Sequence, residues 1–158
     1  MNIYFAAPLF AESEQLYNEM LVGKLREKFP EVTIYLPQEQ GDINDKSQYA
    51  DSKKIALADT NALLASDLLI AVLDGPVIDV GVASEIGVAY QAGIPMVGLY
   101  TDSRQQGSNN PEKLTALSEV AESQFPYANL YTIGLIKLNG QVVSSQETLL
   151  AACEDFLK

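Results

Sequence analysis

The sequence predicts an α/β fold of flavodoxin-like shape, with a parallel sheet flanked by helices in a single domain that spans residues 1–158. Short apolar runs alternate with longer segments that carry apolar residues at helical spacing. One run, residues 67–73 (DLLIAVL), is almost continuously apolar, which is typical of a strand buried on both faces. Ligands of such folds bind beyond the carboxyl ends of the strands, so we expect a site in the loops that follow them.

The strands are expected where short runs are apolar, β-branched or aromatic. The first run (NIYFAA) ends at Pro8, and the second (VTIYL) is followed by a polar, turn-rich loop. The expected strands are residues 2–7, 32–36, 67–73, 95–100 and 130–136. Residues 141–143, after the Asn139-Gly140 turn, can pair with the preceding strand as a short hairpin.

The helices are expected where leucine, methionine and other apolar residues recur with charges between them. The first carries such residues from Ala11 to Phe29 and is stopped by Pro30, and the third consists mainly of small residues. The expected helices are residues 11–29, 47–65, 80–92, 113–124 and 146–157.

Composition excludes several classes of partner. The net charge of −11 and the pI of about 4.3 would repel nucleic acid and anionic membranes. No apolar run reaches the roughly 18–20 residues of a membrane span, and the N-terminus has no basic segment of a signal peptide. The single cysteine, Cys153, suits a reducing cytoplasm, where we expect the protein. With no histidine, no cysteine cluster and no regular carboxylate loop, no metal site or cofactor is expected.

Glu85 is the only charged residue between Val80 and Thr101. A carboxylate among apolar and small residues is unfavourable unless it is paired or used, although a helix carboxylate can also point to solvent. Because the chain has no histidine, acid–base and nucleophilic chemistry would fall mainly to carboxylates, tyrosines or lysines. Glu85 is therefore the first candidate for catalysis.

Other candidates each have a structural alternative. Asp79 precedes the helix of Glu85 and can be its N-cap or an acceptor for a ligand hydroxyl. Asp59 lies in a helix with few other charges and can be a surface acid, and Tyr4 in the first strand can be a core aromatic. Gly81 permits close approach by a strand or by a ligand.

Several segments occur together in a fixed order over most of residues 1–100. They are IYFAAP, a helix with Asp59, ASDLLIAVLDG and DVGVASEIGVAYQAGIPMVGL. The last contains a D-x-G-x-x-x-E-x-G-x-A run formed by Asp79, Gly81, Glu85, Gly87 and Ala89. In these segments the chain resembles the nucleoside 2-deoxyribosyltransferase family.

The resemblance implies transfer of a 2-deoxyribosyl group between nucleobases through a covalent glycosyl–enzyme intermediate. Carried over to this chain, Glu85 is the nucleophile that attacks C1′. Asp59 protonates the leaving base, and Tyr4 hydrogen-bonds to Glu85 and orients it. The chemistry agrees with the composition, because an oxocarbenium-like transition state is served by two carboxylates without metal, histidine or cofactor.

The same resemblance implies a binding site for a deoxynucleoside and a free nucleobase. Asp79 would hold the sugar hydroxyl at the 5′ end, Phe10 would pack against the base, and Gln38 or Gln40 would read its polar edge. A neighbouring subunit completes the base pocket in the family, which implies a homo-oligomer. Tyr127 and Asn129 are the candidates for that late-chain contribution.

Two alternatives remain open. An N-glycoside hydrolase of deoxynucleosides or deoxynucleotides would use the same carboxylates, with water in place of the acceptor base. A related branch that hydrolyses deoxynucleoside monophosphates carries a serine where this chain has Asp79, which disfavours a nucleotide substrate. The other alternative is a non-catalytic nucleoside-binding module.

Overall fold

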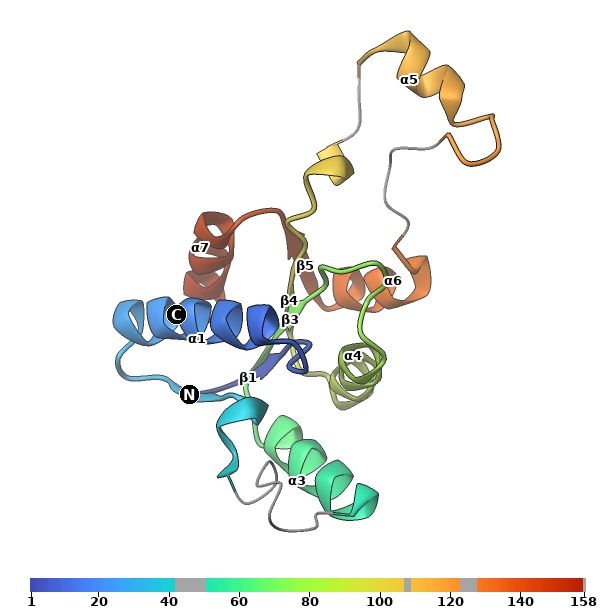
Figure 1. Cartoon of the computed structure of the whole chain (residues 1–158). Coiled ribbons are helices and arrows are strands. Elements are labelled where there is room, and N and C mark those ends of the chain that lie inside the picture. The colour runs from blue at the N-terminus through green and yellow to red at the C-terminus, as the bar shows by residue number, and fades with distance from the viewer. Residues whose placement is uncertain (42–50, 107–108, 123–127, 158) are drawn as a thin grey trace.

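Five parallel strands form one sheet in the computed structural model, which describes residues 1–41, 51–106, 109–122 and 128–157 (Figure 1). The strand order is β2-β1-β3-β4-β5, as in flavodoxin-like folds, and the predicted fold class is confirmed. The strands are β1 (Asn2–Ala6), β2 (Thr33–Tyr35), β3 (Leu68–Val72), β4 (Met96–Leu99) and β5 (Gly140–Val143).

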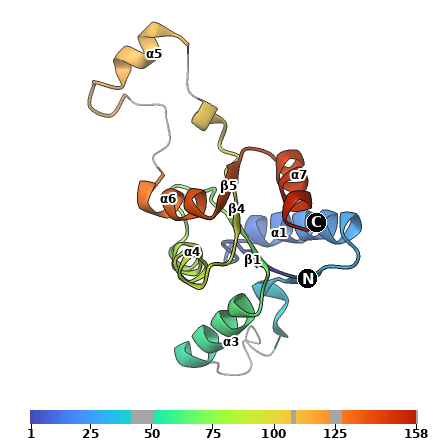
Figure 2. The same ribbon diagram turned by 180° about the vertical axis from the view of Figure 1, so that it is seen from behind.

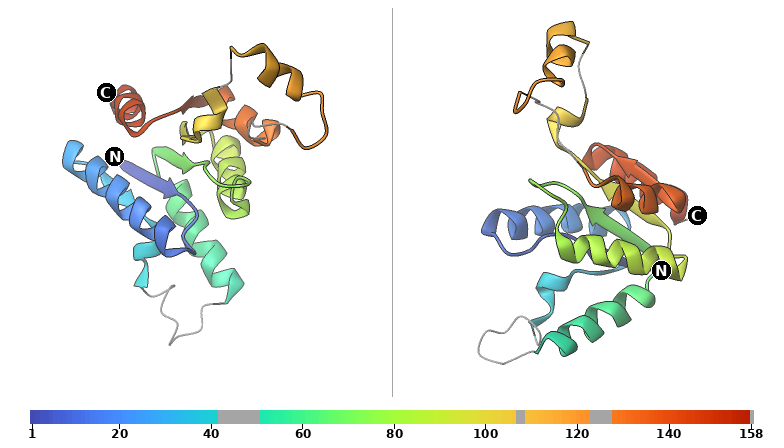
Figure 3. Two further views of the ribbon diagram at one scale, coloured as in Figure 1. Left: turned by 45° about the horizontal axis from the view of Figure 1, so that its top comes forward. Right: turned by 90° about the vertical axis from the view of Figure 1, so that its right-hand side faces the viewer.

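Helices cover both faces of the sheet (Figures 1 and 2). On one face lie α1 (Glu12–Lys28) and α7 (Gln146–Phe156), and on the other lie α3 (Ser52–Leu64), α4 (Val80–Ala92) and α6 (Leu130–Leu138). Two short 3-10 helices, η1 (Pro37–Glu39) and η2 (Ser103–Gln106), follow β2 and β4. The short helix α5 (Pro111–Ala116) stands away from both layers in every view (Figure 3). Within the described ranges, no helix is long and apolar enough to cross a membrane.

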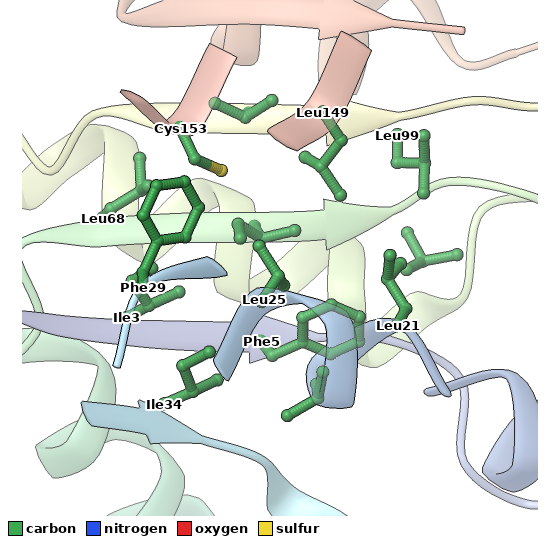
Figure 4. Close-up of a cluster of buried hydrophobic side chains, with 14 of the residues drawn as sticks. Ile3, Phe5, Leu21, Leu25, Phe29, Ile34, Leu68, Leu99, Leu149 and Cys153 are labelled. Atoms are coloured by element: carbon green, nitrogen blue, oxygen red, sulfur yellow. The ribbon is translucent and has the colours of Figure 1, made fainter. Parts of the chain in front are cut away.

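Alternation along β1 divides its side chains between the two faces. Ile3 and Phe5 pack beneath α1 and α7 in the larger core cluster, together with Leu25 and Cys153 (Figure 4). Tyr4 and Ala6 point to the opposite face, toward α3, α4 and α6. This alternation places the Tyr4 side chain on the same side of the sheet as Glu85.

The strand predicted at residues 130–136 is wrong, because these residues form α6. The Asn129 side chain accepts hydrogen bonds from the backbone amides of Tyr131 and Thr132, which starts the helix. Ile133 and Ile136 then face the sheet at helical spacing. A short, almost uniformly apolar run does not distinguish a helix from a strand by its periodicity.

The predicted hairpin at residues 141–143 is also wrong, because β5 pairs with β4 in parallel and α6 crosses over between them. Gly140 begins β5 opposite Met96, so close to that backbone that a Cβ atom would collide with the Met96 carbonyl oxygen. Glycine is therefore required where the edge strand joins the sheet.

Two predicted helices differ in extent from the observed ones. The helix predicted at residues 113–124 ends at Ala116, and α5 has no buried residue whose packing could stabilise further turns. Residues 117–121 form turns and a bend, and the last two predicted positions lie outside the described residues. The helix predicted from residue 47 begins at Ser52, where Asp51 accepts the amide hydrogen of Lys54, and residues 47–50 lie outside the described ranges.

Candidate active site

A cleft of about 290 Å³ opens where β1 and β2 end, on the face covered by α3 and α4. It lies beside the β1–β3 junction, where the strand order changes direction. Five of the candidate residues share this cleft: Phe10, Asp59, Asp79, Gly81 and Glu85. Ala7, Leu9, Pro37, Ile55 and Val82 complete its lining, so no basic side chain is among the described residues that line it.

Glu85 and Tyr4 form a hydrogen-bonded pair at the base of the cleft. The Tyr4 hydroxyl, on a completely buried side chain, donates to Glu85 Oε1 over 2.7 Å. Burial raises the pKa of Glu85 to about 7, the Tyr4 hydrogen bond lowers it, and the charges of Asp59 and Asp79 raise it. Burial and the neighbouring Glu85 raise the pKa of Tyr4, so its hydroxyl keeps its proton and remains a donor. Near neutral pH, Glu85 can exist in either protonation state.

Asp59 has a tyrosine partner of its own. The Tyr35 hydroxyl donates to Asp59 Oδ1 over 3.2 Å. Burial raises the pKa of Asp59, and the hydrogen bond from Tyr35 lowers it. The pKa of Tyr35 is raised to about 12, first by burial and then by Asp59. Sequence reasoning missed Tyr35; the available signal was that the first two predicted strands each carry a tyrosine, and paired positions of neighbouring parallel strands lie on the same face of a sheet.

Asp79 is the N-cap of α4. Its Oδ1 atom accepts hydrogen bonds from the backbone amides of Gly81, over 2.8 Å, and Val82, over 3.1 Å. A Cβ atom at Gly81 would lie 3.0 Å from that oxygen, so glycine keeps the cap and the cleft wall uncrowded. The structural and ligand-binding roles considered for Asp79 are compatible, because the cap uses one carboxylate oxygen.

The two glutamines that were candidates for reading the base do not line the cleft. The Gln38 side chain accepts a hydrogen bond from Asn18 Nδ2, over 2.9 Å, and donates to the Gln15 carbonyl oxygen. Asn18 is buried and also donates to the Pro8 carbonyl oxygen, so it joins the loop after β1 to η1. The Gln40 side chain donates to the carbonyl oxygen of Leu36.

Of the two late-chain candidates, only Asn129 is among the described residues, and it does not line this cleft. Asn129 caps α6, and Tyr127 lies outside the described residues. In the described part of the chain, no group of three or more Asp, Glu or Cys side chains is placed to hold a metal ion. The cleft therefore offers three carboxylates, two of which accept hydrogen bonds from tyrosine hydroxyls, and these groups can stabilise a developing positive charge and move protons.

Solved structures share this fold. A conserved protein of Enterococcus faecalis V583 is 63% identical, with 98% of each chain covered and a TM-score of 0.93. The 2-desoxiribosyltransferase of Leishmania mexicana is 22% identical, covering 98% of this chain and 95% of its own, with a TM-score of 0.64. A CMP N-glycosidase of Clostridium botulinum is 16% identical, covering 99% of each chain, with a TM-score of 0.51. No curated protein sequence matches the chain.

The family comparison covers nearly the whole chain. The model for nucleoside 2-deoxyribosyltransferase matches residues 3–147, a range that includes β1 from its second residue, every described residue that lines the cleft, and α6. Together with the shared fold, this match shows that the chain belongs to the nucleoside 2-deoxyribosyltransferase family.

Proposed function

We propose that the protein transfers a 2-deoxyribosyl group from one nucleobase to another through a glycosyl ester of Glu85. One observation carries the proposal: Glu85 is held by Tyr4 at 2.7 Å in the same cleft as a second acid, Asp59. The charge of Asp59 is close enough to raise the pKa of Glu85. Membership of the family and the shared fold support the same reaction class.

In the first half-reaction, Glu85 attacks C1′ while the bond from C1′ to the base nitrogen breaks. The electron pair of that bond stays with the base, and Asp59 gives a proton to a base ring nitrogen. Tyr4 holds Glu85 Oε1, which leaves Oε2 for the bond to C1′. In the second half-reaction, the incoming base loses a proton to Asp59 and attacks C1′, which releases the Glu85 carboxylate.

The cleft suits an uncharged sugar. Three carboxylates line it, and the described lining includes no lysine or arginine that could pair with a phosphate. The Asp79 oxygen that is not used by the cap of α4 is available for the 5′ hydroxyl. A deoxynucleoside fits this charge distribution better than a deoxynucleotide does.

The test is chromatography of the protein with a 2′-deoxynucleoside, with and without a second free base. Transfer predicts a new deoxynucleoside that forms only when the second base is present. Equal release of the first base under both conditions would replace transfer by hydrolysis. No reaction across a panel of deoxynucleosides, with binding retained in both the parent and Glu85→Ala proteins, would support a binding module.

The covalent intermediate has a separate test. Mixed with a deoxynucleoside and no acceptor, the protein should gain the mass of one deoxyribosyl group, located on the peptide that contains Glu85. Glu85→Gln should show neither the adduct nor turnover. An active Glu85→Gln protein would contradict the assignment of the nucleophile.

A further inference from the structure

We infer that Tyr35 is a positioning residue for the general acid: it holds Asp59 Oδ1 so that Oδ2 carries the proton to the leaving base. The inference rests on the proposed function and adds a residue to it. Tyr35 does not line the cleft and acts only through Asp59.

The hydrogen bond defines which oxygen of Asp59 is available. Tyr35 donates to Oδ1, and among the described residues no other side chain bonds to the Asp59 carboxyl group. The hydrogen of the Tyr35 hydroxyl already points at Oδ1, so a second hydrogen on that oxygen is disfavoured. A protonated Asp59 therefore carries its hydrogen on Oδ2. Because Asp59 lines the cleft, this oxygen can face a bound base.

The strand register fixes where the Tyr35 hydroxyl lies. Tyr4 and Tyr35 are paired residues of β1 and β2, and their rings stack with centroids 5.3 Å apart. The same pairing directs one hydroxyl to Glu85 and the other to Asp59. Each carboxylate therefore has one oxygen held by a tyrosine and one oxygen left for the reaction.

Orientation of this kind has a kinetic signature. General acid assistance is worth on the order of 10²–10⁴-fold in rate, and it matters most when the leaving base forms an unstable anion. A substituent that withdraws electrons stabilises the anion and reduces the need for a proton. Loss of Tyr35 should therefore slow the cleavage of poor leaving bases more than the cleavage of good ones.

The experiment compares Tyr35→Phe with the wild type on 2′-deoxyuridine and 5-fluoro-2′-deoxyuridine, which differ by one electron-withdrawing atom. If the wild type cleaves only purines, 2′-deoxyinosine and its 8-aza analogue replace them. Phenylalanine keeps the ring stacked on Tyr4. The matched control is Tyr90→Phe, which removes a hydroxyl from an exposed residue of α4.

For Tyr35→Phe we expect kcat to fall about 10-fold on the poorer leaving base and less than about 2-fold on the better one. KM should change less than about 2-fold on both, because Tyr35 does not line the cleft. Tyr90→Phe should leave all these constants unchanged.

A double-mutant cycle tests whether Tyr35 acts through Asp59. In an Asp59→Asn background, Tyr35→Phe should add no further loss. Equal losses on both bases, or a full additional loss in the Asp59→Asn background, would overturn the inference while leaving the transferase proposal intact. A wild-type protein that cleaves no deoxynucleoside would overturn both.

Discussion

The ring of Tyr4 stacks on the ring of Tyr35, with centroids 5.3 Å apart and planes inclined by 19°. The stack exists because the two residues are register partners in neighbouring parallel strands. It brings together two hydroxyl donors whose acceptors, Glu85 and Asp59, come from different helices, α4 and α3. Through these two tyrosines, the register of β1 and β2 determines where one oxygen of Glu85 and one oxygen of Asp59 are held.

The pH dependence of activity should report Glu85. The reaction needs Glu85 ionised and Asp59 protonated, so the pair must hold one proton. We expect kcat/KM to fall as pH rises through about 7, where the pair loses that proton. Tyr4→Phe removes the hydrogen bond that lowers the pKa of Glu85, so the fall should move to higher pH. The measurement is kcat/KM between pH 5 and 9. A fall at the same pH in Tyr4→Phe would contradict the role of Tyr4.

Stability should depend on pH through the same carboxyl group. The pKa of Glu85 is raised from 4.5 to about 7 on folding, so between these values the folded state binds more protons than the unfolded state. The free energy of unfolding therefore falls as pH rises through this window. Glu85→Gln has no carboxyl group at this position, so its free energy of unfolding should not fall in this way. The variant should be more stable than wild type at pH 8, by on the order of 2 kcal/mol, and the difference should vanish near pH 4.

Urea unfolding at pH 4, 6 and 8 measures this difference. The control is Glu19→Gln, which makes the same chemical change at an exposed position of α1. A difference between Glu85→Gln and wild type that stays constant over this pH range would show that Glu85 does not take up a proton on folding.

Substitutions of Asp79 should separate its capping and binding roles. Asp79→Ser keeps an oxygen that can cap α4, so the free energy of unfolding should stay within about 0.5 kcal/mol of wild type. Asp79→Ala loses the cap, so its free energy of unfolding should be lower than that of wild type by about 1 kcal/mol. Both should raise KM for deoxynucleosides, because both lose the second carboxylate oxygen. An unchanged KM in Asp79→Ser would show that Asp79 is only a cap.

Phe10 should affect the base and not the fold. Its side chain is 81% exposed at the edge of the cleft, so Phe10→Ala should change the free energy of unfolding by less than about 0.5 kcal/mol. KM should rise several-fold as the contact with the base is lost. Leu16→Ala, at an exposed position of α1 that does not line the cleft, is the control. An unchanged KM would remove Phe10 from the site.

The roles of Gln38 and Gln40 can be distinguished by measuring the free energy of unfolding and KM of each alanine variant. Gln38→Ala takes the acceptor from a buried Asn18 amide and should lower the free energy of unfolding by about 1 kcal/mol. Gln40→Ala removes one hydrogen bond to the Leu36 carbonyl oxygen and should change stability less. The variant whose KM responds to the polar groups of the base identifies the reader, and no response in either would exclude both.

Much of the fold was predictable because its signals are local. The continuous apolar run of β3 and the small residues of α4 indicated their elements directly, and the spacing from Asp79 to Glu85 placed one cleft residue at the N-cap of a helix and the other within that helix. The segment of α6 was not predictable, because its almost uniformly apolar residues fit the 3.6-residue repeat of a helix and the two-residue repeat of a strand equally well. The helix is started by one side chain, Asn129.

The parts of the site that escaped prediction depend on contacts between distant segments. That Tyr35 meets Asp59 follows from the register of β1 and β2 and from the way α3 packs on them. The Gln38 side chain turns away from the cleft because Asn18, twenty positions earlier, offers it a hydrogen bond. Neither contact leaves a periodic trace in the sequence.

Every described residue that lines the cleft comes from between Ala7 and Glu85. The chain after α4 supplies β4, β5, α6 and α7, which complete the sheet and its cover. The described residues that line the cleft and those that form the β4–β5 side of the sheet thus come from consecutive stretches of one chain. Substitutions at described positions between 96 and 157 can change the packing on that side of the sheet without replacing any side chain that lines the cleft.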